Sequence, residues 1–150
     1  MARTSDVTIT LASNPGDLAA AIECNLLASL AASAPQGGYA PLALAARDRD
    51  GTLLGGLVGS TSYGWLLIKM LWVMESARGG GLGARMMEMA EDDALSRGCH
   101  GAWLDTSSDR ARGFYERLGY EPFGILENKD GESPEGHRRF FMRKRLTRQL

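Results

Sequence analysis

A cluster of glycines lies between an apolar run and a helix-like segment, and it limits the folds open to this chain. The run at 65–73 is almost wholly apolar, and Arg78 is followed by glycine at four of the next five positions. Glycine lets the backbone approach a ligand closely, because it has no Cβ. The first amides of a helix have no partner inside the helix and bind anions. We therefore predict that residues 78–84 bind a pyrophosphate group.

Length and charge narrow the possible classes of protein. A chain of 150 residues fits one domain, which we expect to span 1–150. A net charge of −1 gives no reason to expect binding to nucleic acid or to an anionic membrane. The N-terminus lacks the apolar core of a signal peptide, and Lys69 interrupts the longest apolar run. We therefore expect a cytoplasmic protein. We also expect no metal, since no His/Cys spacing matches a zinc site.

The first half of the chain predicts strands around one helical region. Alternation predicts a strand over 6–12. Asn14 and Pro15 form a helix start, and a four-residue apolar spacing predicts one or two helices that end before Pro35. Residues 39–48 and 53–62 are expected to form a hairpin, because turn-forming residues separate them. The apolar segment 65–74 is expected to be a central strand.

In the second half, strands alternate with helices. The glycines are followed by an amphipathic helix that closes at Arg97-Gly98, with Glu88, Glu91 and Asp92 placed off its apolar face. Residues 101–105 predict a short strand, and 106–109 cap a helix that ends at Gly119. Residues 120–127 and 138–146 are expected to be the closing strands. The order indicates a mixed α/β sheet (α+β-type) rather than a doubly wound one.

A dinucleotide site is the main alternative for the glycine cluster. Residues 79–84 also satisfy G-x-G-x-x-A, with Asp105 as a possible acidic partner. Three observations disfavour it: the motif follows several strands, the chain is too short for two mononucleotide-binding halves, and Arg78 is foreign to that fingerprint. A tight turn without a ligand is also disfavoured, because four glycines cost considerable backbone entropy.

Two motifs together resemble one family. Arg78-x-x-Gly81-x-Gly83 resembles the acetyl-CoA signature of the GNAT N-acetyltransferase superfamily. The segment 111–120, ARGFYERLGY, resembles the family's A-x-x-[FL]-Y-x-x-x-G-[FY] segment. Their order and spacing also fit. The resemblance implies a central mixed, mostly antiparallel sheet flanked by helices, in the order β-α-(α)-β-β-β-α-β-α-β-β.

The resemblance also implies a reaction and a set of site residues. Acetyl-CoA would donate its acetyl group directly to an amine in a ternary complex, without a metal. The strand at Val73 would diverge from its neighbour, so that its backbone pairs with the pantetheine arm and the Val73 amide polarises the thioester carbonyl. Tyr115 would protonate the leaving thiolate, and Arg78 would shape the loop. The pyrophosphate would bind the amides of Gly79, Gly80, Gly81, Leu82, Gly83 and Ala84.

Two departures from the family pattern leave roles open. Ser108 stands where many members have an asparagine that contacts the pantetheine, and it either makes that contact or caps the helix. Residues 65–72 hold no carboxylate that could act as the general base. The candidates are Glu75, Asp105 and His137, or bulk water.

The preferred function is acetylation of a small-molecule amine, and two other functions stay open. The acceptor amine could instead be a protein N-terminus or a lysine. A non-catalytic acyl-CoA-binding module is the other possibility, because the usual asparagine and strand carboxylate are missing. A homodimer is the expected assembly, since small oligomers are mostly two-fold.

Overall fold

The computed structural model describes residues 6–33 and 37–148, and the chain divides into two compact units. The units are Met1–Gln36 and Gly37–Leu150. In the first, the predicted helix is one continuous element, α1 (Pro15–Ser33), which begins at the predicted proline. Its apolar residues Leu18, Ile22 and Leu26 are exposed, so none of them packs within this unit.

The strand predicted over 6–12 is wrong. Asp6 lies in a short 3-10 turn, and residues 7–12 have no regular structure and are exposed. Alternating apolar and polar residues suit a segment to a sheet. A strand forms only where a neighbouring strand supplies the partners for its backbone hydrogen bonds. No strand among the described residues pairs with this segment, so the predicted order loses its first β element.

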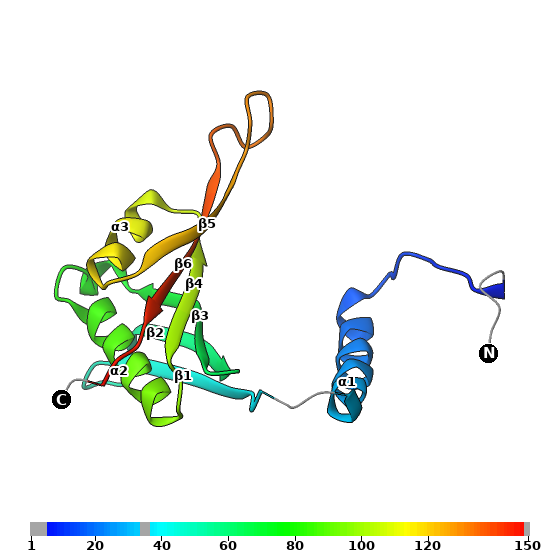
Figure 1. Cartoon of the computed structure of the whole chain (residues 1–150). Helices are drawn as coiled ribbons and strands as arrows, with labels where there is room; N and C mark the ends of the chain where they lie inside the picture. Colours follow the sequence, from blue (N-terminus) through cyan, green and yellow to red (C-terminus); the bar gives the residue numbers. More distant parts are fainter. Residues whose placement is uncertain (1–5, 34–36, 149–150) are drawn as a thin grey trace. The chain divides into compact units, whose positions relative to one another are not determined.

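The second unit is built on a six-stranded sheet in the order β1-β2-β3-β4-β6-β5 (Figure 1). Neighbouring strands are antiparallel except β3 and β4, which are parallel. A mixed, mostly antiparallel sheet flanked by helices was predicted, and it is confirmed. The strands are β1 (Ala40–Arg47), β2 (Leu53–Ser62), β3 (Trp65–Val73), β4 (Gly101–Thr106), β5 (Glu121–Glu127) and β6 (Arg138–Arg145).

The helices of this unit lie where the motifs placed them. A short 3-10 turn, η2 (Glu75–Ala77), leads from β3 to the glycines and into α2 (Leu82–Ser96), and α3 (Asp109–Arg117) follows β4. The end of α2 is tied to the first hairpin, because Nη1 of Arg97 donates to the Pro41 carbonyl and to Oγ1 of Thr61 at 3.1 and 3.2 Å. None of the helices in the described ranges is long and apolar enough to cross a membrane.

The core lies between the sheet and α2 and α3. Each buried aliphatic or aromatic side chain contributes about 1.5–3 kcal/mol relative to exposure. The largest fully buried side chains come from four strands and from α2: Leu57, Leu66, Met87, Leu104, Phe140 and Met142. This packing fixes the position of α2, and therefore of the glycine loop that precedes it.

Candidate functional site

The glycine loop joins β3 to α2 through residues with left-handed backbone. Gly79 and Gly81 have φ of 88° and 78°, and Gly81 is the N-cap of α2, with no side chain to bond the first helical amides. A Cβ at either position, or at Gly80, would meet no atom within 4 Å. Gly79 and Gly81 are therefore required by backbone conformation rather than by crowding, and the surface above the three glycines is open to a ligand.

Gly83 has a different role, because it lies against α3. A Cβ there would stand 3.4 Å from Cζ of Phe114 and 3.7 Å from Cγ2 of Val73. The small residue lets the first turn of α2 approach both the end of β3 and the aromatic part of α3. Two motifs that lie far apart in the sequence are thereby brought into contact.

The parallel strands diverge next to this loop. β3 and β4 pair only from Trp65–Gly101 to Ile68–Leu104, although β3 continues to Val73. The register between β3 and β2 shifts at the same point, so that Lys69 is an extra residue in β3. Beyond Ile68, β3 is paired with β2 alone, and the divergence expected at Val73 is present in the register.

The amide of Val73 lies on the edge that β4 has left. Successive N–H groups of an extended strand point to opposite edges, and the Met74 N–H donates to the Leu54 carbonyl in β2 at 2.7 Å. The Val73 N–H therefore faces the diverging side. The Val73 carbonyl accepts a 3.1 Å hydrogen bond from Nε of Arg78, which fixes the turn between strand and loop.

A cavity of about 550 Å³ lies between the end of β3, the glycine loop and α3. All the predicted cofactor-binding residues except Gly80 line it: Val73, Arg78, Gly79, Gly81, Leu82, Gly83, Ala84, Ser108 and Tyr115. The cavity is also lined by Arg110, Phe114 and Arg117, which were not predicted from the sequence. Their spacing of i, i+4, i+7 on one helix was the signal that they share a face.

Ser108 and Tyr115 enter the cavity from opposite ends of α3. Oγ of Ser108 accepts a 3.1 Å hydrogen bond from the Ala111 amide, so it caps the helix as well as lining the cavity. The Tyr115 ring stands edge-on to Phe114 and to Tyr120, with centroids 5.2 and 5.9 Å away. Burial raises the pKa of the Tyr115 phenol, which is therefore protonated at neutral pH.

The candidates for the general base lie outside this cavity. Glu75 is exposed in η2, Oδ1 of Asp105 is 3.9 Å from Nε of Arg139, and His137 lies in the loop before β6. None of the three lines the cavity. Among residues 6–33 and 37–148, no group of three or more His, Cys, Asp or Glu side chains is arranged to hold a metal ion.

Comparison with known proteins identifies one family. Residues 14–120 match the model of the acetyltransferase (GNAT) family. The chain is 44% identical over 80 residues to an acetyltransferase of Agrobacterium fabrum. The matched stretch covers 53% of this chain and 58% of that protein. It is 46% identical over 71 residues to the blasticidin-S acetyltransferase of Streptomyces morookaense. That match covers 47% of this chain and 52% of that protein.

Those matches span little more than half the length of either relative. A likeness to a solved structure covers far more of the chain. The crystal structure of an acetyltransferase candidate from Agrobacterium tumefaciens has a TM-score of 0.78 and 33% identity, and the match covers 93% of this chain and 97% of that one.

Proposed function

The chain belongs to the acetyltransferase (GNAT) family, and from that premise we propose that it transfers the acetyl group of acetyl-CoA to a primary amine of a small molecule. The amine attacks the thioester directly in a ternary complex. The observation that carries this proposal is the 550 Å³ cavity, because it brings the glycine loop, the Val73 amide edge and Tyr115 to one place.

Acyl-CoA binding involves the glycine loop and the end of β3, which both line that cavity. The amides of the glycine loop and of the first turn of α2 bind the pyrophosphate, aided by the positive end of the helix dipole. Arg78, Arg110 and Arg117 line the cavity and offset the phosphate charge. The unpaired edge of β3 beyond Ile68 offers peptide groups to the two amides of the pantetheine arm.

The chemistry uses the inner end of the cavity. Attack on the thioester develops negative charge on the carbonyl oxygen, and we assign the stabilisation of that charge to the Val73 N–H. Tyr115 then gives its proton to the departing thiolate, since its pKa keeps it protonated at neutral pH. Glu75, Asp105 and His137 stay predictions for the base, and solvent is the route that the geometry favours, because none of the three lines the cavity.

The acceptor is assigned by similarity. The blasticidin-S acetyltransferase is a relative whose name states a substrate, and that substrate is a small molecule. This supports a small amine over a protein amine for the present chain. The cytoplasmic location and the homodimer stay predictions.

The test is thiol release with a panel of small amines that includes blasticidin S. We expect the purified chain to bind acetyl-CoA and not NAD, and to release CoA thiol with at least one amine. Saturation at about 100 times Kd stabilises a folded chain by roughly 2.7 kcal/mol, so binding is followed by thermal shift. Binding of acetyl-CoA without thiol release from any amine would favour the non-catalytic acyl-CoA-binding module.

A further inference from the structure

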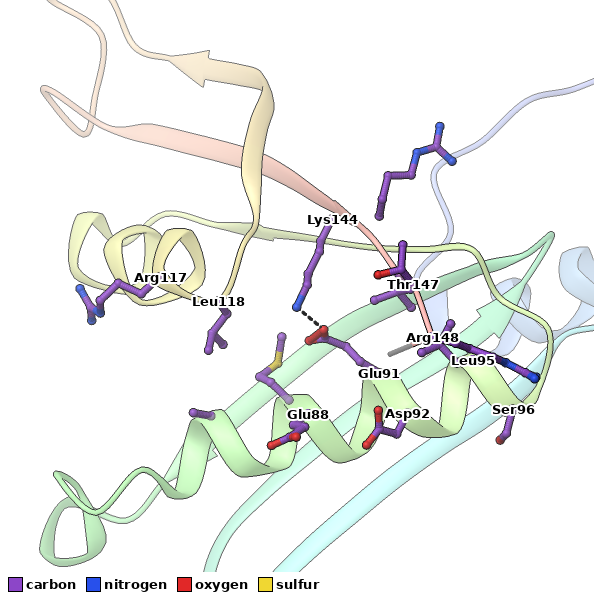
Figure 2. Close-up of a pocket in the computed structure, with 14 residues that line it drawn as sticks. Glu88, Glu91, Asp92, Leu95, Ser96, Arg117, Leu118, Lys144, Thr147 and Arg148 are labelled. Carbon is purple, nitrogen blue, oxygen red and sulfur yellow. Dashed lines mark hydrogen bonds and ion pairs between the residues drawn. The ribbon is translucent and has the colours of Figure 1, made fainter. Parts of the chain in front are cut away.

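A partly buried polar network of Glu91, Lys144 and Tyr120 lies next to Tyr115. It was not predicted from the sequence. Glu91 was placed off the apolar face of its helix, but it is only 7% exposed. Its two carboxylate oxygens accept from Nζ of Lys144 at 2.5 Å and from the Tyr120 hydroxyl at 3.4 Å. Figure 2 shows Lys144 of β6 reaching down to Glu91 on α2.

The network is costly unless every member is paired. A buried carboxylate loses its hydration, and burial raises the pKa of Glu91 while the hydrogen bond from Lys144 lowers it. Burial, followed by the Glu91 carboxylate, raises the pKa of Tyr120, so Tyr120 stays protonated and acts as the donor. The three side chains therefore hold one another in one arrangement, which joins α2 to β6.

Tyr120 connects this network to Tyr115. The Tyr120 amide donates to the Tyr115 carbonyl at 3.0 Å, and the two rings meet edge-on at 5.9 Å. In the part of the chain that the structure describes, no protein group hydrogen-bonds the Tyr115 hydroxyl. The direction of that hydroxyl is therefore set by the packing of the ring between Phe114 and Tyr120.

We propose that Glu91 and Lys144, acting through Tyr120, position Tyr115 for acetyl transfer. Glu91, Lys144 and Tyr120 are positioning residues, since only Tyr115 lines the acyl-CoA cavity. The inference rests on the proposed function. It adds that the orientation of the Tyr115 ring depends on a hydrogen bond made by the hydroxyl of a different tyrosine.

The network also borders a second cavity, of about 770 Å³, between α2 and the end of β6. Glu88 lines this cavity on the same helix as Glu91, as Figure 2 shows. No hydrogen bond or ion pair joins Glu88 to the network within the described residues. Glu88→Gln is therefore a matched control for Glu91→Gln, with the same chemical change one turn away.

The test is a double-mutant cycle on kcat with acetyl-CoA saturating. Tyr120→Phe keeps the ring and removes only the hydroxyl. Since a small misplacement of a catalytic group costs up to about 100-fold, we expect Tyr120→Phe and Glu91→Gln each to lower kcat by about tenfold, with the KM for acetyl-CoA unchanged. In a Tyr115→Phe background the same changes should lower kcat by less than about twofold, because the hydroxyl that they position is gone.

The possible results separate the two proposals. An equal loss in both backgrounds, or no loss from Tyr120→Phe, overturns the positioning role and leaves the acetyltransferase proposal standing. A second readout needs no turnover: NMR spectra of the labelled tyrosine rings should show the Tyr115 signals shifted by Tyr120→Phe and Glu91→Gln but not by Glu88→Gln. Unchanged Tyr115 signals overturn the inference even if no amine is acetylated.

Discussion

Replacing Gly81 with alanine tests whether the loop needs a glycine for its backbone conformation rather than for its packing. Gly81 has φ of 78°, and an added methyl group would meet no atom within 4 Å. The left-handed conformation costs an alanine roughly 1–2 kcal/mol, with no clash added. Gly80→Ala is the matched control, because Gly80 has open space too and does not have a left-handed φ.

The cost must appear in one of two measurements. If the loop keeps its conformation, the free energy of unfolding falls by about 1–2 kcal/mol, and acetyl-CoA binds as before. If the loop relaxes, stability is preserved, but binding must restore the conformation, and Kd rises by roughly 5- to 30-fold. Chemical denaturation and calorimetric titration with acetyl-CoA measure the two. A Gly81→Ala chain unchanged in both, or matched in both by Gly80→Ala, would refute the role of the left-handed backbone.

Three further predictions concern the elements around the site. Ser108→Ala should destabilise the chain by about 1 kcal/mol, because it removes the side chain that caps the helix. Ser108→Asp keeps a capping oxygen and should leave stability unchanged. Equal stability of the two variants in chemical denaturation would contradict this prediction. Arg97→Ala should lower the free energy of unfolding by about 1 kcal/mol, because it leaves Oγ1 of Thr61 without its donor. Arg85→Ala, on the exposed side of the same helix, should leave stability unchanged. A comparable drop in Tm from both variants would argue against a stabilising contact between Arg97 and the first hairpin. Because burial raises the pKa of Tyr120 in the folded chain, its contribution to stability is complete below a pH of about 10 and is lost as the pH rises further. Thermal unfolding at pH 8 and pH 11 should therefore show a larger loss for the native chain than for Tyr120→Phe, and parallel losses would count against that contribution.

Local patterns were sufficient to predict the loop and its helices. Glycines at 79–83 and the apolar period from Leu82 specify a turn and a helix start through backbone and burial preferences of neighbouring residues. The strand that precedes them was predicted for the same reason. The segment 6–12 shows the limit of this reasoning, because its alternation is also local but its hydrogen-bond partner is not.

The misplacement of Glu91 has a similar cause. On one helix a glutamate next to Asp92 looks solvated, and nothing within α2 indicates otherwise. Its partner Lys144 lies 53 residues later, on the strand that completes the sheet. Long-range pairing of this kind is decided by the fold, so it can be seen only once β6 has been placed beside β4.

The early divergence of β3 and β4 gives this sheet an edge in its interior. Peptide groups on an outer edge invite pairing with any extended chain, which proteins usually prevent. Here the groups that β4 leaves unpaired, from Lys69 to Val73, lie on an inner edge of the sheet rather than on an outer one. Recognition by main-chain groups makes no demand on side chains. In the proposed function the pantetheine arm pairs with this inner edge through main-chain groups, so a substitution at Met70, whose side chain is 62% exposed on β3, leaves those contacts in place.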